Sequence, residues 1–299
     1  MSNSEFDLQG HRGARGLAPE NTLHGFRLAA RLGVRTMELD VGTTRDGAVV
    51  VHHDPALNPD ITRDGSGAWL DGPGPLLHDL TLAQLQAYDV GRLRPGTTYA
   101  EAYASQVSHD GARIPTLDQV LALDATLRWN IELKLTPDRP GCTIPAEEMV
   151  ERVLHVVDAA GAGPRVALQS FDWAAPRHLR RIRPGIAAGW LTDEKTVADA
   201  PVWLGRHLGG MSDVPDAVAK EGGGTWAPHH ADLTEDLLDQ AHDLGLHVLP
   251  WTVNAVDDMR RLVDWGVDGL ITDWPDRALP LLPLPPGEDR GEGSGTRQV

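Results

Sequence analysis

Short apolar runs recur along the chain, and segments with apolar residues at helical spacing separate most of them. The runs lack strict polar–apolar alternation, which is typical of strands buried on both faces in a parallel sheet covered by helices. Eight runs in 299 residues predict an α/β protein, a (β/α)8 TIM barrel with an insertion at the barrel mouth. The runs are FDLQG (6–10), TMELDV (36–41), RWNIELKL (128–135), RVALQSF (165–171), IAAGWL (186–191), GTWAPHH (224–230), HVLPWTVN (247–254) and DGLITDW (268–274).

One further apolar segment, AVVVHHD, follows the second run after only six residues, GTTRDG. A parallel pair of strands needs a crossover of about a dozen residues. Asp46 and Gly47 instead indicate a tight turn. We therefore expect residues 49–53 to run back antiparallel as a hairpin arm, which returns His53 to the barrel mouth.

Residues 1–275 are predicted to form one barrel domain, and residues 55–113 interrupt its pattern. The interruption is rich in Pro, Gly and Asp, and it contains one short helix with a Thr81/Gln84 capping box. Its apolar content is too low for an independent core, so we expect an insertion in the loops at the barrel mouth. Residues 276–299 are Pro-rich and then Gly-rich, and they are predicted to be a disordered tail.

The charge balance limits the partners. The chain has 27 Lys and Arg against 43 Asp and Glu, a net charge of −16, which repels nucleic acid and anionic membrane surfaces. To bind an anionic ligand, the protein would need a locally positive electrostatic potential, and a bound metal cation is the obvious candidate for its source. Cys142 is the sole cysteine, so no internal disulfide forms. The sequence has neither a secretory signal nor a membrane-spanning run, and we expect a soluble cytoplasmic protein.

Carboxylates recur at two strand ends. Glu38 and Asp40 lie two residues apart in MELDV, as do Glu132 and Lys134 in IELKL, and residues at i and i+2 share one face of a strand. One such pair could simply be solvated or paired with Arg. The same geometry at two strand ends, where barrel enzymes build their sites, favours a divalent metal bound by Glu38, Asp40 and Glu132. Oxygen ligands suit Mg2+ or Ca2+ better than zinc.

Two histidines are expected at the same mouth. His11 ends the first strand and His53 ends the hairpin arm, and two imidazoles can act as general acid and base near neutral pH. Asp54 could hydrogen-bond a ring nitrogen and fix its tautomer, whereas His52 must point away from His53 and is predicted to be structural.

Arg12 lies in the loop HRGARGLAPENT, which links the first strand to a helix. Its forked donors suit phosphate oxygens. Together with Lys134, a divalent metal and an acid–base pair, Arg12 indicates a phosphoester site.

The ordered set HRG, PENT, ELD, TRDGAVVVHHDP, ELK, QSF, WTVN and GVDGLITDWP resembles the glycerophosphodiester phosphodiesterases over most of residues 8–275. The resemblance implies a TIM barrel and hydrolysis of glycerophosphodiesters to glycerol 3-phosphate and an alcohol. It also implies metal ligation by Glu38, Asp40 and Glu132, with His11 and His53 as acid and base. It places Arg12 and Lys134 in the phosphate-binding region.

Three further residues are expected at the substrate. Gln169, Trp251 and Asn254 end strands that face the mouth, and they are predicted to shape the glycerol pocket, although a core role for Trp251 is equally open. We assign His53 as the acid at the leaving oxygen and His11 as the base. The alternatives are a lysophospholipase D or sphingomyelinase-D-like activity and a non-catalytic phosphate-ligand-binding barrel, while the preferred alcohol is not readable from the sequence.

Overall fold

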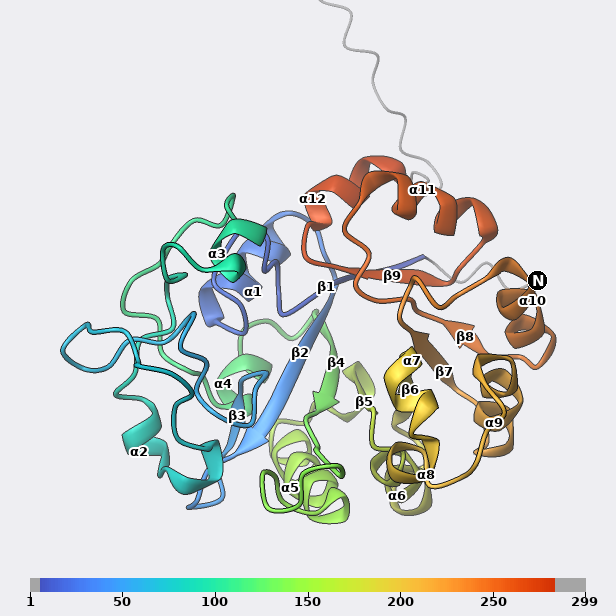
Figure 1. The fold of residues 1–299 in the computed structure, drawn as a ribbon, viewed down its shortest axis with the longest axis horizontal. Coiled ribbons are helices and arrows are strands. Elements are labelled where there is room, and N and C mark those ends of the chain that lie inside the picture. Colours follow the sequence, from blue (N-terminus) through green and yellow to red (C-terminus); the bar gives the residue numbers. More distant parts are fainter. Residues whose placement is uncertain (1–5, 283–299) are drawn as a thin grey trace, which may run out of the picture.

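Eight parallel strands form a ring at the centre of the computed structural model, which describes residues 6–282 (Figure 1). Their hydrogen-bonded order is β8-β7-β6-β5-β4-β2-β1-β9. Between β8 and β9, the Asp268 amide donates to the Val248 carbonyl at 3.2 Å, which helps to close the ring. The predicted (β/α)8 barrel is therefore confirmed. The strands are β1 (Asp7–Gly10), β2 (Thr36–Thr43), β4 (Arg128–Leu133), β5 (Val166–Ser170), β6 (Ala187–Thr192), β7 (Thr225–Pro228), β8 (His247–Val248) and β9 (Gly269–Thr272).

The predicted hairpin arm is also present. Strand β3 (Val49–Val51) pairs antiparallel with β2, with Val51 opposite Val41. Gly47 takes the left-handed conformation that the turn requires, with φ of +87°. The chain then returns to the end of β2, where the His52 amide donates to the Asp40 carbonyl at 3.0 Å.

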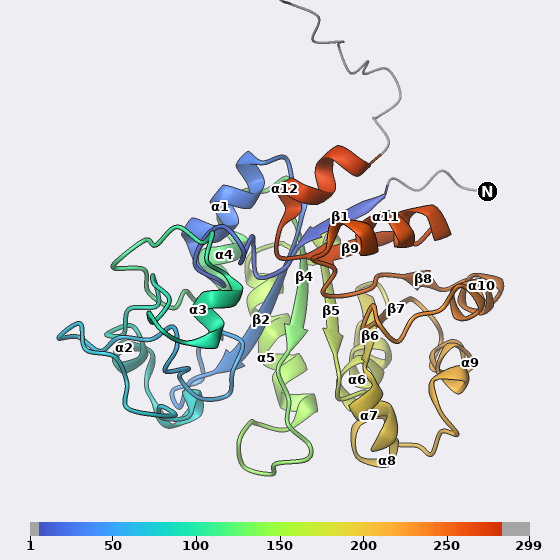
Figure 2. The same cartoon turned by 45° about the horizontal axis from the view of Figure 1, so that its top comes forward.

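Helices surround the ring of strands (Figure 2). A capping box of Thr116 and Gln119 begins α4, and the Thr234 side chain caps α10. The helices are α1 (Leu23–Arg31), α2 (Leu82–Leu85), α3 (Thr98–Ala102), α4 (Leu117–Leu121), α5 (Ala146–Ala159), α6 (Ala174–Ile182), α7 (Glu194–Ala198), α8 (Ala200–Trp203), α9 (Val214–Lys220), α10 (Glu235–Asp243), α11 (Val256–Trp265) and α12 (Pro275–Ala278), with 3-10 turns at Leu77–Asp79, Gly163–Arg165, Met211–Asp213 and Leu279–Leu281.

The burial of β2 explains why its acids face inward. All eight residues of the strand are buried. Met37, Leu39 and Val41 belong to the apolar core that packs against the helices. Because side chains alternate between the two faces of a strand, Glu38 and Asp40 point to the barrel interior.

The insertion between β3 and α4 lies beside α1, in blue-green and green in Figure 1. The prediction that it has too few apolar residues for a core is wrong in one respect. A small apolar cluster joins the insertion to β3, and its members are Val50, Leu57, Leu77, Leu85, Val90 and Ile114. The insertion is thus anchored on the hairpin arm. Its predicted helix is confirmed as α2, with the Thr81/Gln84 capping box.

The barrel domain extends beyond the predicted boundary at residue 275. Helix α12 and the turn Leu279–Leu281 follow, and Ala278 is fully buried in the apolar core around β6 to β9. The small apolar side chains of this segment pack although its Pro content suggested a tail. The rest of the predicted tail, residues 283–299, lies outside the described residues. Within residues 6–282, no helix is both long and apolar enough to cross a membrane.

Candidate active site at the barrel mouth

Three buried carboxylates converge at the C-terminal ends of β2 and β4. Asp40 and Glu132 are direct neighbours in the ladder between these strands, and Glu38 lies on the same face as Asp40. One ligand oxygen of each of the three lies within 4.8 Å of those of the other two. Burial, with the charges of Asp40 and Glu132, raises the pKa of Glu38 well above its ordinary value. The three carboxylates therefore repel one another, and this repulsion disfavours the ionised form of Glu38.

The donor set fits a divalent metal. All three ligands are carboxylates, which Mg2+ and Ca2+ prefer. Asp40 Oδ1 is buried and has no hydrogen-bond partner among the described residues, and a buried oxygen in this state costs free energy unless a donor or a cation meets it. A cation there would also relieve the repulsion that raises the pKa of Glu38.

Arg12 and Lys134 supply cations beside these acids. The Arg12 amide donates to Glu38 Oε2 at 3.1 Å, and its Nε lies 3.3 Å from Asp40 Oδ2. Lys134 Nζ donates to Glu132 Oε1 at 2.6 Å and lies 3.6 Å from Asp40 Oδ1. Although burial acts to raise it, Arg12, with His53 and Lys134, holds the pKa of Asp40 well below its usual range.

His11 is held in one orientation by an aspartate. Its Nδ1 lies 2.7 Å from Asp273 Oδ1, and its Nε2 lies 3.8 Å from Glu38 Oε2. An ionised carboxylate only accepts, so Nδ1 carries the proton and Nε2 is free to accept one. Burial, aided by the charges of Arg15 and Arg12 and opposed by Asp273, lowers the pKa of His11 to about 4. The ring is therefore neutral near pH 7.

His53 repeats this arrangement on the hairpin arm. Its Nδ1 lies 2.7 Å from Asp54 Oδ1, as predicted, and Asn58 donates to the other oxygen of Asp54 at 2.9 Å. Burial, with the charges of Arg12 and Lys134, lowers the pKa of His53 well below its ordinary value. In both histidines, therefore, Nδ1 is bound to an aspartate and the pKa of the ring is lowered.

The three predicted glycerol-pocket residues differ in where they lie. Trp251 lies at the mouth, where its ring meets Phe171 edge-on with centroids 5.3 Å apart, and Phe171 lies 5.9 Å from Lys134 Nζ. Asn254 instead binds Asp273, donating to Oδ2 at 2.7 Å and accepting from its amide at 3.0 Å. Asn254 thus orients Asp273, and its contact with substrate stays a prediction.

Gln169 faces the opposite end of the barrel. Its carbonyl oxygen accepts from Asn130 at 3.0 Å, and Asn130 also donates to Gln9. These amides line a cavity of about 320 Å³ between the N-terminal ends of the strands. The hydrogen bond from Asn130 holds the Gln169 side chain toward this cavity, so the structure does not bring it together with the carboxylates and histidines at the mouth.

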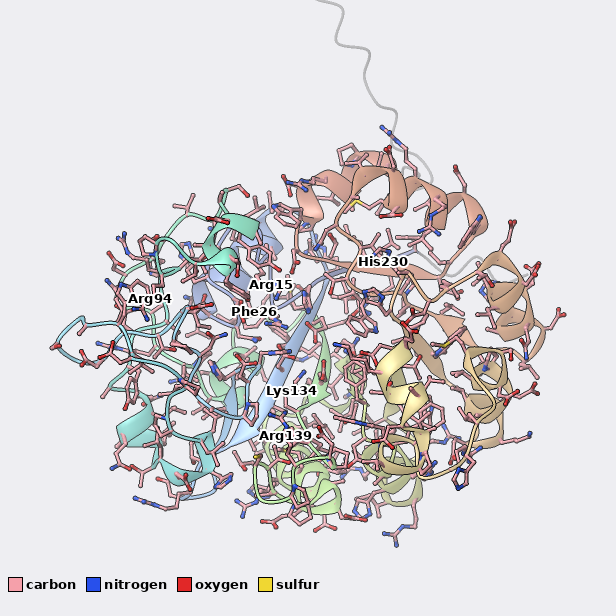
Figure 3. The ribbon with its side chains drawn as sticks, viewed as in Figure 1. Arg15, Phe26, Arg94, Lys134, Arg139 and His230 are labelled. Carbon is pink, nitrogen blue, oxygen red and sulfur yellow. The ribbon has the colours of Figure 1, made fainter. Side chains whose placement is uncertain are left out.

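Four residues at the site were missed in the sequence. Asn21 donates to Asp40 Oδ2 at 2.8 Å, and Glu20 accepts from Arg12 at 2.8 Å. Asp273 accepts two hydrogen bonds from Arg15, at 2.8 and 2.9 Å. Asp273 directly follows β9, the neighbour of β1, and that adjacency was the available signal. In Figure 3, Arg15 and Lys134 lie toward the centre of the molecule, whereas Arg94 lies out on the insertion.

The chain is similar to known proteins along nearly its whole length. The Glycerophosphoryl diester phosphodiesterase family matches residues 11–277. A glycerophosphodiester phosphodiesterase of Caldanaerobacter subterraneus is 28% identical over 275 residues, 91% of this chain and 96% of the relative. A putative glycerophosphodiester phosphodiesterase of Bacillus subtilis is 30% identical over 268 residues, 89% of this chain and 93% of the relative.

Solved structures agree with the fold. The crystal structure of a putative glycerophosphoryl diester phosphodiesterase from Silicibacter pomeroyi has a TM-score of 0.84 and 38% identity, covering 93% of both chains. An Oleispira antarctica phosphodiesterase in complex with the product sn-glycerol-3-phosphate has a TM-score of 0.69 and 23% identity, covering 92% of this chain and 96% of that one. The second likeness bears on the fold alone.

Proposed function

Because this chain belongs to the glycerophosphoryl diester phosphodiesterase family, we propose that it hydrolyses glycerophosphodiesters to sn-glycerol 3-phosphate and an alcohol. One observation carries the proposal. Two imidazoles that are neutral near pH 7, each fixed at Nδ1 by an aspartate, flank a cluster of three buried carboxylates and two cations. This combination supplies what a phosphodiester needs, which is charge neutralisation and proton transfer at two oxygens.

Glu38, Asp40 and Glu132 would hold the divalent cation, Mg2+ or Ca2+. When bound, this cation supplies a Lewis acid that neutralises charge on a phosphate oxygen and lowers the repulsion between the carboxylates. Two observations support this assignment: Asp40 Oδ1 is buried without a hydrogen bond among the described residues, and the pKa of Glu38 is raised.

Arg12 and Lys134 would bind the remaining phosphate oxygens. Arg12 is 7% exposed, so its guanidinium acts in a poorly hydrated environment where ionic hydrogen bonds are strong. Its Nε is buried and makes no hydrogen bond among the described residues. The guanidinium pairs with Glu20 and Asp40, which hold it in place beside the carboxylate cluster.

His11 acts as the base and His53 as the acid in this proposal. Asp273 and Asp54 hold the Nδ1 protons, so each Nε2 can exchange a proton with the substrate. His11 Nε2 removes a proton from water or from the neighbouring glycerol hydroxyl, and the second choice gives a transient cyclic phosphate. An anionic phosphodiester beside His53 favours its protonated form, which then donates to the departing alkoxide oxygen.

Trp251 and Phe171 form an apolar wall next to Lys134, and we place the carbon face of the glycerol there. This placement keeps the charged phosphate on the side of the cations and the metal. It leaves the alcohol moiety toward the insertion, where the chemistry of the loops gives no single preference.

The test is a substrate panel. Release of sn-glycerol 3-phosphate is measured for glycerophosphocholine, glycerophosphoethanolamine, glycerophosphoglycerol and glycerophosphoinositol. Lysophosphatidylcholine and sphingomyelin are included for the lysophospholipase D and sphingomyelinase-D-like alternatives, with choline release as their readout, because this cleavage yields choline and a phosphorylated lipid. We expect turnover of at least one soluble diester at a rate above that of either lipid. Turnover of the lipids alone, or of no diester at all, contradicts the proposal.

A further inference from the structure

The segment that follows helix α3 of the insertion is hydrogen-bonded to the loop that carries His11 and Arg12. The Val107 amide donates to the Leu17 carbonyl at 2.9 Å, and Gln106 donates to the Arg15 carbonyl at 2.8 Å. Ser105 donates to the Gly16 carbonyl at 2.8 Å. These bonds hold the insertion segment at a fixed distance from the loop.

Tyr99 of α3 reaches the partner of Arg12. Its hydroxyl donates to Glu20 Oε2 and accepts from Arg15 Nη1 at 3.2 Å, while Glu20 Oε1 accepts from Arg12. Arg12, Arg15 and Glu20 are each less than 10% exposed. Burial, together with the charge of Glu20, raises the pKa of Tyr99 well above its ordinary value, so the phenol keeps its proton. Tyr99 thus donates a hydrogen bond to the Glu20 carboxylate oxygen that does not accept one from Arg12.

Tyr103 reaches the partner of His11. Its ring lies 4.6 Å from the Arg15 guanidinium carbon, and its hydroxyl lies 3.3 Å from Asp273 Oδ2. The same ring stacks on Trp274 with centroids 5.5 Å apart. Arg15 is therefore held between a carboxylate, which orients His11, and an aromatic face.

We propose that Tyr99 and Tyr103 are positioning residues for the reaction, Tyr99 acting on Arg12 through Glu20 and Tyr103 acting on His11 through Arg15 and Asp273. The insertion is then a part of the site and not only a cover over it. Neither tyrosine bonds to the three carboxylates or to His11 in the contacts described above. The inference rests on the proposed function, because it names the residues that keep the phosphate-binding cation and the base in place.

The test is Tyr99→Phe, with Tyr88→Phe as the matched control. Tyr88 lies in the same insertion, and its hydroxyl has no hydrogen bond within residues 6–282. For Tyr99→Phe we expect the KM for a glycerophosphodiester and the Kd for sn-glycerol 3-phosphate, measured by calorimetry, to rise at least about tenfold. Tyr88→Phe should stay within about twofold of the wild type. Loss of folded protein alone would lower the apparent kcat and leave KM and Kd unchanged.

Equal KM and Kd in the two variants would overturn the role of Tyr99. Should Tyr99→Phe fail to fold, Tyr103→Phe and Tyr103→Leu decide instead. With kcat expressed per folded molecule, as quantified by circular dichroism, the first keeps the ring over Arg15 and should lower kcat about threefold. The second should lower it at least about thirtyfold. Equal kcat values for both and the wild type would overturn the proposal. A wild type without any hydrolysis would instead overturn the proposed function, and this inference with it.

Discussion

Asp273→Asn is expected to remove activity and to destabilise the fold, for separate reasons. The side chain is fully buried, and its two oxygens accept from His11, Arg15, Asn254 and Tyr103. An amide turns one acceptor into a donor and leaves the buried Arg15 cation unpaired, which costs about 3–5 kcal/mol of unfolding free energy. An amide group facing His11 Nδ1 would also favour the tautomer protonated at Nε2. That tautomer cannot act as a base, and we expect kcat to fall about 10³–10⁴-fold.

The assay compares urea unfolding and steady-state kinetics of Asp273→Asn with Asp276→Asn, an exposed residue three positions along. Asp276→Asn should change neither quantity measurably. Adding Arg15→Gln to Asp273→Asn removes the unpaired cation, so stability should recover in part while kcat stays low. Wild-type kcat in Asp273→Asn would refute the role of the His11–Asp273 pair. Full recovery of kcat in the double variant would refute the tautomer explanation.

Four further outcomes are expected. Burial lowers the pKa of His11 to about 4 from an ordinary value of 6.5, so the unfolded chain binds a proton that the folded chain does not. The unfolding free energy of the metal-free protein should therefore fall by about 3 kcal/mol more in the wild type than in His11→Gln between pH 7 and 4, and parallel profiles would contradict this. His53→Ala should lose most activity on a glycerophosphodiester yet keep much of its activity on a nitrophenyl diester, because nitrophenolate departs without a proton. His11→Ala should lose activity on both substrates, and the reverse pattern would exchange the two roles. Residues 55–113 can be replaced by a Gly/Ser link, with Val50→Thr to make the newly exposed surface of β3 less apolar, and the product should be a folded barrel with little activity. An unfolded product would show that the barrel needs the insertion in order to fold. Divalent metal should raise the melting temperature with the logarithm of its excess in the wild type but not in Glu38→Gln, and equal shifts would place the metal elsewhere.

The barrel and its carboxylate cluster were predictable because both follow from the period of a strand. Fully buried runs gave the eight parallel strands, and the spacing of Glu38 and Asp40 placed both side chains on one face. The short link GTTRDG left room only for an antiparallel return, so the position of His53 also followed.

Side-chain directions that depend on a hydrogen bond to another strand or loop could not be predicted. Gln169 lies in register with Glu132, yet Asn130 draws its amide to the far end of the barrel. Asn254 ends near the mouth, and Asp273 uses both of its polar atoms. The spacing of residues along one strand does not reveal these hydrogen-bond partners, because they come from other strands and loops.

The contribution of the insertion was hidden for the same reason. Its apolar residues share a cluster with Val50 of β3, and Tyr99 contacts Glu20 and Arg15 from a loop about 80 residues earlier. Such contacts become visible only once the barrel has brought these segments together.

The most direct measurement is the rate of sn-glycerol 3-phosphate release by chelator-treated protein as Mg2+ or Ca2+ is added back. Glu38→Gln is tested beside it, with Glu235→Gln, an exposed residue on α10, as the control. We expect no release without metal, full recovery in the wild type and in Glu235→Gln, and a requirement for at least about 100-fold more metal in Glu38→Gln. Full activity of the metal-free wild type, or the same metal dependence in all three proteins, would contradict the assignment of the carboxylate cluster as the metal centre of this phosphodiesterase.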